Sequence, residues 1–205
     1  MGILKKEGED LACGKGRHSI FLNKKGIKVT GVDLSEQSIL EAQKSENNRL
    51  SFFTHDMRIP AWKNHFDFVL NLFTSFGYFE NEQDNYKTIA NISDALKPNG
   101  ILVLDFMNAT KVVNNLVPKE SKTIDGITFN LKRTVIKGFI TKTIQFEDAG
   151  KQFEYQEKVQ ALKLADFEKY FKAANLKIVD IFGNYNLDDF DEQNSDRLIL
   201  IAKKT

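Results

Sequence analysis

The sequence predicts an α/β fold, in which a mainly parallel sheet is buried between helices and an antiparallel insertion follows it. Short, continuously apolar runs alternate with helix-like segments between residues 19 and 106, and such runs are typical of parallel strands buried on both faces. Between residues 122 and 159, polar and apolar residues alternate instead. That second pattern predicts an antiparallel sheet with one solvated face.

Composition narrows the class of protein. The 205 residues, 41% of them hydrophobic, are enough for one core, so a single domain over residues 1–205 is expected. Basic residues (29) and acidic residues (28) nearly balance, which gives no indication of a nucleic-acid partner. No apolar run is long enough to span a membrane, and Met1–Lys6 has no signal-peptide core. With one cysteine, the chain fits a reducing, cytoplasmic environment.

The first element is a glycine-rich turn, Gly14-Lys15-Gly16, that leads into a predicted helix over residues 19–26. Glycines allow a tight turn and a close approach of backbone to ligand, and the helix start offers free N–H groups. A strand over residues 28–32 then ends in Asp33, 17 residues after Gly16. An acid near this offset can hold ribose hydroxyls, so the pattern predicts a nucleoside-containing cofactor. A helix N-terminal acid is the alternative reading of Asp33.

Further strands and helices alternate up to residue 106. Ser35 is a predicted N-cap, with Ser38 in place of the capping-box Glu, and Lys97-Pro98-Asn99-Gly100 is predicted to stop a helix. The expected elements are a helix over 35–44, strands over 50–54 and 66–72, a helix over 84–96 and a strand over 101–106.

The antiparallel insertion has turn signals at Asp125-Gly126, Lys137-Gly138 and Ala149-Gly150, which predict three or four strands within residues 122–159. After it we expect a helix over 164–174, a strand over 177–182, a polar loop over 183–196 and a last strand over 197–202.

The residues before the glycine turn do not look like a buried strand. Lys5-Lys6-Glu7-Gly8-Glu9 is charged and is predicted not to fit a sheet centre, which leaves only Leu11 and Ala12 as strand. Either the first strand is unusually short or residues of the native protein are missing from this chain. We favour the second interpretation.

Five motifs in order resemble those of the class I S-adenosylmethionine-dependent methyltransferases of the small-molecule type. They are Asp10-Leu11-Ala12-Cys13-Gly14-Lys15-Gly16, Gly31-Val32-Asp33-Leu34-Ser35, His55-Asp56-Met57, Phe66-Asp67-Phe68-Val69-Leu70-Asn71 and Leu96-Lys97-Pro98-Asn99-Gly100-Ile101-Leu102. The resemblance covers residues 10–108 and the closing helix–strand–strand pattern. Ala12 stands where the family often has a third glycine, and we expect its methyl group to be tolerated at a negative φ.

The resemblance implies a Rossmann-like seven-stranded sheet whose last strand is antiparallel, with the β insertion between the fifth strand and the last helix. It implies S-adenosylmethionine as methyl donor, S-adenosylhomocysteine as product, and methyl transfer to N or O of a small molecule. Two alternatives stay open: a protein that binds S-adenosylmethionine without transferring methyl groups, and another nucleotide-dependent enzyme such as a reductase. A reductase is less favoured because Ser19 replaces a third glycine and no second nucleotide-binding half is found.

The resemblance also implies which residues contact the cofactor. Asp10 is assigned to the methionine ammonium, Asp33 to the ribose, Asp56 and Met57 to the adenine, and an ordinary turn aspartate is the alternative reading of Asp56. The full predicted set is Asp10, Ala12, Gly14, Gly16, Asp33, Leu34, Asp56, Met57, Asn71 and Leu72.

The catalytic residues are not assigned, with Tyr78 and His18 as candidates. The aromatic segment 73–79 follows a strand at the sheet edge where ligands bind, and it either lines a substrate pocket or packs in the core. His18 is alternatively a surface or capping residue, and Cys13 is predicted to be a small buried filler. The three histidines lack metal-ligand spacing, so no metal site is predicted. The insertion fits either a lid or the surface of a homodimer.

Overall fold

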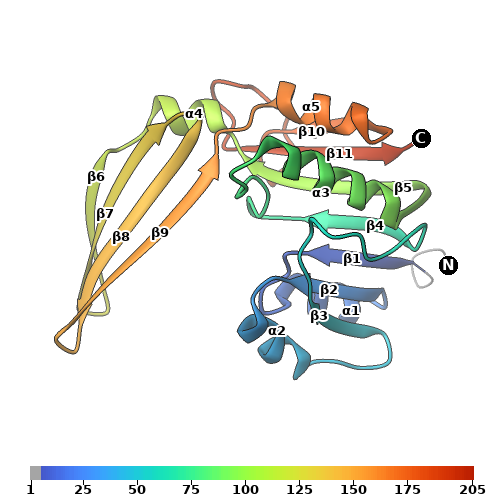
Figure 1. The fold of residues 1–205 in the computed structure, drawn as a ribbon, viewed down its shortest axis with the longest axis horizontal. Helices are drawn as coiled ribbons and strands as arrows, with labels where there is room; N and C mark the ends of the chain where they lie inside the picture. Colours follow the sequence, from blue (N-terminus) through green and yellow to red (C-terminus); the bar gives the residue numbers. More distant parts are fainter. Residues whose placement is uncertain (1–5) are drawn as a thin grey trace.

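The computed structural model describes residues 6–205, so most of the segment considered for a signal peptide lies outside the described residues. The first sheet has seven strands in the order β10-β11-β5-β4-β1-β2-β3, and the second has four in the order β6-β7-β8-β9 (Figure 1). The seven strands are β1 (Glu7–Leu11), β2 (Lys28–Asp33), β3 (Leu50–Thr54), β4 (Phe66–Asn71), β5 (Leu96–Met107), β10 (Leu176–Phe182) and β11 (Arg197–Lys204).

The seven-stranded sheet confirms the predicted fold class. Strand β1 pairs in parallel with both β2 and β4, and β4 pairs in parallel with β5. The last strand, β11, is inserted between β5 and β10 and is antiparallel to both. The carboxyl ends of the parallel strands therefore share one edge, where loops from distant parts of the chain meet (Figure 1).

The helices lie close to their predicted positions, with one addition. They are α1 (Arg17–Lys24), α2 (Glu36–Gln43), α3 (Glu82–Ala95), α4 (Ala109–Asn114) and α5 (Leu164–Ala173). Ser35 caps α2, its hydroxyl accepting from the Ser38 N–H as predicted. Helix α4 was not predicted, because six residues are too few to show helical periodicity. Strand β5 begins earlier than predicted, so the turn at Asn99 (φ 64°) lies within its bounds.

Apolar side chains pack into two clusters. The larger one combines β1, β4, β5 and β11 with α3 and α5, and its fully buried residues include Phe66, Phe106 and Phe167. The smaller one joins β2 and β3 to α2 and includes Val29 and Phe52. Helices α3 and α5 contact each other beside the sheet (Figure 1).

The prediction that Glu7–Glu9 cannot form a buried strand is wrong. Strand β1 lies inside the sheet, between β4 and β2, over Glu7–Leu11, and Gly8 to Leu11 are buried. Glu7, at the strand's start, accepts from Lys28 (2.7 Å) and lies 3.0 Å from His65. Gly8 leaves room for the Phe68 ring, with which a Cβ would clash. The Glu9 side chain is 3% exposed, and burial raises its pKa to about 8, so it is buried as the neutral acid.

The insertion forms all four strands, with its three turns where predicted. Its strands are β6 (Lys119–Ile124), β7 (Ile127–Ile136), β8 (Phe139–Asp148) and β9 (Lys151–Gln160). The expectation of a single solvated face is wrong, because burial in these strands is confined to Ile140, Val159 and Gln160 near the base. The sheet projects from the body beside the carboxyl edge of the parallel strands (Figure 1). Its base is attached there, since the Gln160 N–H donates to the Gly77 carbonyl at 2.8 Å.

Within residues 6–205, no helix is long and apolar enough to cross a membrane.

Replacing Glu9 with Gln should stabilise the protein increasingly as the pH rises. The folded-state pKa of Glu9 is raised from 4.5 to about 8, so the folded chain holds a proton that the unfolded chain has released between these values. The stability associated with this proton is complete below pH 4.5 and is lost as the pH rises through 8. The advantage of Glu9→Gln in free energy of unfolding should grow by on the order of 2–3 kcal/mol between pH 6 and 8.5.

Urea unfolding at the two pH values measures this difference. Glu41→Gln is the control, because the hydrogen bond from Lys44 lowers the pKa of Glu41 and its charge does not change in this range. An advantage of Glu9→Gln that is the same at both pH values would contradict the assignment.

Candidate active site

The glycine turn between β1 and α1 is a left-handed backbone segment. Ala12, Gly14 and Gly16 have φ values of 63°, 54° and 78°. A Cβ at Gly16 would lie 2.6 Å from the Phe52 ring, whereas a Cβ at Gly14 would meet no atom within 4 Å. Gly16 is therefore required for packing, and Gly14 leaves its backbone open to approach by a ligand.

The expectation that Ala12 has a negative φ is wrong. Its φ of 63° lies in the region that disfavours side chains with a Cβ. The turn holds it there because the next residue, Cys13, donates its N–H to the Val32 carbonyl at 2.9 Å. Cys13 itself is buried and packs in the smaller apolar cluster, in agreement with the predicted filler role. Burial also raises the pKa of its thiol, so it is not a reactive thiolate.

Asp33 ends β2 directly opposite the glycine turn. Its Oδ2 accepts from the Gly14 N–H and its Oδ1 from the Ser35 N–H, both at 2.8 Å. Each carboxylate oxygen keeps a further lone pair, so Asp33 can still accept hydrogen bonds from a diol. The side chain of the next residue, Leu34, is 69% exposed and offers an apolar surface beside the acid.

Asp56 and Met57 follow β3 at the same edge. The carboxylate of Asp56 is bound by the Arg58 guanidinium at 2.6 Å, and this hydrogen bond lowers the pKa of Asp56. Arg58 also lies over the Phe79 ring, 5.6 Å from its centroid. The Met57 carbonyl accepts from the Asn91 side chain on α3 at 3.0 Å, which fixes this turn against the helix.

These segments enclose a cavity of about 420 Å³ at the carboxyl edge, a size typical of small-molecule sites. The structure brings six predicted site residues together in its lining: Ala12, Asp33, Leu34, Asp56, Met57 and Tyr78. The other lining residues are Leu11, His55, Arg58, Ser75, Phe79, Glu80, Asn81 and Asp84. Sequence reasoning missed Arg58, Asn81 and Asp84, although Asn81 could have been found as the N-cap of α3.

Asp10 and Asn71 are not in the lining and are buried beside it. Asp10 Oδ2 accepts from the N–H and the hydroxyl of Ser19, at 3.1 and 2.6 Å, and burial raises its pKa. Asn71 donates to the Leu11 carbonyl at 3.1 Å, and its Oδ1 has no hydrogen-bond partner among residues 6–205. Gly14, Gly16 and Leu72 are likewise outside the lining. The predicted cofactor contacts of these five residues stay predictions.

The two catalytic candidates are placed differently. Tyr78 lines the cavity with half of its surface exposed, and its pKa is raised by burial and by the charge of Glu157. His18 is outside the lining and stacks on Phe73, with ring centroids 5.1 Å apart. Within the described chain, no three His, Cys, Asp or Glu side chains are grouped as metal ligands.

Comparisons with known proteins agree with this geometry. Residues 10–100 match the family model described as a methyltransferase domain. The Bacillus subtilis protein YqeM is 39% identical over 106 residues, which cover 50% of this chain and 43% of that protein. Glycine N-methyltransferase of Rattus norvegicus is 31% identical over 129 residues, covering 53% of this chain and 44% of that enzyme. The matches therefore span less than half the length of these two relatives.

A solved structure extends the likeness to nearly the whole chain. An S-adenosylmethionine-dependent methyltransferase from Clostridium acetobutylicum superposes with a TM-score of 0.86 at 24% identity, covering 97% of this chain and 83% of that one. The fold is thus that of the class I methyltransferases, and the predicted resemblance is confirmed. Residues 10–100 match a methyltransferase domain, and the chain has the fold of a solved S-adenosylmethionine-dependent methyltransferase.

Replacing Ala12 with Gly should stabilise the fold, because glycine has no Cβ to strain at φ 63°. We expect the free energy of unfolding to rise by about 1 kcal/mol in urea denaturation. The same substitution at Ala42, within the α2 helix, is the control and should lower stability by about 1 kcal/mol or more. A destabilised Ala12→Gly variant would show that the methyl group contributes packing that outweighs the strain.

Proposed function

We propose that this chain is a methyltransferase that binds S-adenosylmethionine and transfers its methyl group to N or O of a small molecule. The observation that carries the proposal is that Ala12, Asp33, Leu34, Asp56 and Met57 line one and the same cavity. These residues come from the ends of three neighbouring strands, at the edge where open α/β sheets bind ligands.

The chemistry of these residues fits a nucleoside with an amino-acid tail. Asp33 can accept the ribose hydroxyls, and the exposed Leu34 side chain and Met57 offer apolar surface to a base ring. Gly14 leaves open space for close approach, and the unpaired Asn71 Oδ1 is a buried acceptor at the end of β4. An orphaned acceptor of this kind is costly unless a ligand or water satisfies it, which supports a polar ligand here.

S-adenosylmethionine supplies an electrophilic methyl group, so the protein's task is alignment of the acceptor and exclusion of water. Tyr78 is suited to orienting the acceptor. Because its pKa is raised, its hydroxyl keeps its proton at neutral pH and acts as a hydrogen-bonding group rather than a base. An amine that is bound unprotonated already carries the lone pair that attacks the methyl group and needs no general base, and no base is assigned.

Nitrogen is the acceptor atom that we favour. The aromatic rings of Tyr78 and Phe79 line the cavity, and their π-faces attract cations such as a sulfonium or the ammonium that a neutral amine becomes on methylation. The rat relative is named as an N-methyltransferase of glycine, which supports a small amine as acceptor.

The single cysteine, reduced and buried, supports action in the cytoplasm.

Two other functions are distinguishable by binding experiments. Calorimetric titration with S-adenosylmethionine and S-adenosylhomocysteine, followed by turnover assays on small amines, separates an enzyme from a protein that only binds the cofactor. Quenching of NADH fluorescence by the protein would indicate a reductase instead.

Asp33→Ala should weaken S-adenosylmethionine binding at least tenfold, about 1.4 kcal/mol, because the ribose loses its acceptor. Isothermal titration calorimetry measures the change. Glu36→Ala, on the exposed first turn of α2, is the matched control and should bind as the wild type does. Equal affinity of the Asp33 and Glu36 variants would remove Asp33 from the site.

We also propose that the projecting sheet forms the interface of a homodimer. Cross-strand register places Leu131, Ile144 and Tyr155 on one face, with Phe129, Phe146 and Phe153 in the next row. Charges of both signs flank these rows, including Lys122, Glu120, Lys142 and Glu157. A two-fold axis through these rows would place the apolar side chains of the two copies against each other.

Phe146→Lys tests this interface. Its ring contacts Phe129, Phe153 and Tyr155 at centroid distances of 4.9 to 6.0 Å, so a charge there should dissociate a dimer. Sedimentation velocity should show a dimer for the wild type and a monomer for the variant. Thr143→Lys on the opposite face is the control. A wild type that is monomeric at micromolar concentration would contradict the dimer interface, and the role as a lid would then be the remaining one of the two considered.

A further inference from the structure

We propose that Asp105 and Arg197 are positioning residues of the cofactor site, because together they hold the strained turn that follows β4. The inference rests on the proposed function, since it concerns the affinity of the same cavity. Arg197 begins the last strand of the chain, nearly a hundred residues beyond the segment that matches the methyltransferase domain.

The turn after β4 contains two adjacent left-handed residues. Phe73 and Thr74 have φ values of 57° and 62°. A β-branched residue such as Thr is a genuine outlier in this region. Backbone strain of this kind persists only where surrounding contacts enforce it, and it is concentrated at functional sites.

Asp105 and Arg197 supply those contacts. The Phe73 N–H donates to Asp105 Oδ2 and the Thr74 N–H donates to the Asp105 carbonyl, both at 2.9 Å. Arg197 donates from Nε to Asp105 Oδ1 at 2.7 Å and from Nη2 to the Thr74 hydroxyl at 3.0 Å. Backbone and side chain of the turn are therefore both tied to one ion pair, and Asp105 is only 2% exposed.

The turn connects this ion pair to the cavity. Ser75, the next residue, lines the cavity and closes the turn by donating to the Leu72 carbonyl at 2.7 Å. On the other side, the Phe73 ring stacks on His18 of α1 and lies 5.3 Å from the Arg17 guanidinium. A shift of the turn after β4 would therefore move Ser75 in the cavity wall. It would also disturb the contact between Phe73 and His18 of α1.

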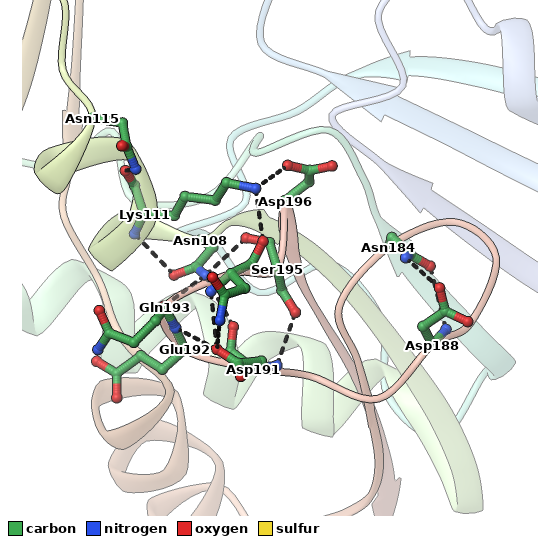
Figure 2. A network of polar contacts seen from close by, with 11 residues as sticks. Asn108, Lys111, Asn115, Asn184, Asp188, Asp191, Glu192, Gln193, Ser195 and Asp196 are labelled. Carbon is green, nitrogen blue, oxygen red and sulfur yellow. Dashed lines mark hydrogen bonds and ion pairs between the residues drawn. The ribbon is translucent and has the colours of Figure 1, made fainter.

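The loop between β10 and β11 adds a further contact to the same carboxylate. Tyr185 donates to Asp105 Oδ2 at 3.0 Å, and its ring lies 5.9 Å from that of Phe73. Figure 2 shows how the loop is held: the Asn108 side-chain amide faces the loop backbone, and Lys111 reaches Asp196. Asn108 Nδ2 lies within hydrogen-bond distance of the carbonyls of Glu192 (2.8 Å) and Ser195 (2.9 Å). The loop is therefore fixed by its own hydrogen bonds, and Tyr185 from the loop and Arg197 from β11 both contact Asp105.

The test compares affinity for S-adenosylhomocysteine with stability in variants of this network. Arg197→Met should weaken binding by about tenfold, the range seen when coupled residues are disrupted. Thr74→Val keeps the shape but loses the hydroxyl, and it should weaken binding by about threefold. Thr74→Ser keeps the hydroxyl and should bind as the wild type does. Hydrogen exchange of the peptide containing Phe73 and Thr74 should accelerate in Arg197→Met.

Lys97→Met is the matched control. Lys97 of β5 and Asp67 of β4 form an ion pair of 3.1 Å near the start of both strands, at the end of β5 opposite to Asp105. This variant loses a β4–β5 ion pair without touching the turn, so its affinity should equal that of the wild type.

The outcomes decide the proposal. Folded Arg197→Met and Thr74→Val variants with wild-type affinity would overturn it, and so would a loss of affinity in Lys97→Met equal to that in Arg197→Met. If the wild type binds no S-adenosylhomocysteine, the proposed function fails. The exchange measurement then still tests the turn, and unchanged protection in Arg197→Met and Thr74→Val would overturn its positioning by the ion pair.

Discussion

An inner strand of the sheet must be buried on both faces, and the rest of the structure depends on how β1 meets that constraint. Strand β1 lies between β2 and β4 and carries Gly8, Glu9 and Asp10 where apolar residues would be ordinary. Gly8 has no Cβ, so the Phe68 ring can pack against it. Glu9 is buried as a neutral acid, and Asp10 accepts a hydrogen bond from the Ser19 hydroxyl. Glu9 thus loses its charge and Asp10 gains hydrogen bonds, which lowers the cost of burying them.

The cavity follows from this strand. Because β1 ends at Leu11, the glycine turn begins level with the end of β2, and Gly14 meets Asp33. The ends of β3 and β4 complete the walls with Met57 and Ser75. The site is therefore built from turns rather than from the regular elements, and its geometry depends on contacts that fix those turns.

Much of the fold could be predicted from the sequence, because buried parallel strands and antiparallel hairpins have different periodicities. The three hairpin turns were found because Asp-Gly, Lys-Gly and Ala-Gly stand at left-handed positions, with φ values of 47° to 82°. The part of β1 before Leu11 was missed because burial was judged from residue type alone. The compensating partners of Glu7, Lys28 and His65, are 21 and 58 residues away in the chain.

Part of the candidate site could also be predicted, from the expected ends of the strands. Asp33, Asp56 and Met57 could be placed because each follows a strand and so lies at a known edge. The strain at Ala12 could not be seen, since φ depends on the whole turn. The contacts of Asp105 with Arg197 and Tyr185 join residues 92 and 80 positions apart, and local patterns do not report such pairs.

The position of β11 has a consequence for biosynthesis. Of the seven strands of this sheet, β11 is synthesised last, yet it lies inside the sheet between β5 and β10. Until residues 197–204 emerge, β5 of the nascent chain presents an open edge of unpaired backbone groups, which is a template for association with other chains. The sheet can therefore be completed only after residues 197–204 have emerged.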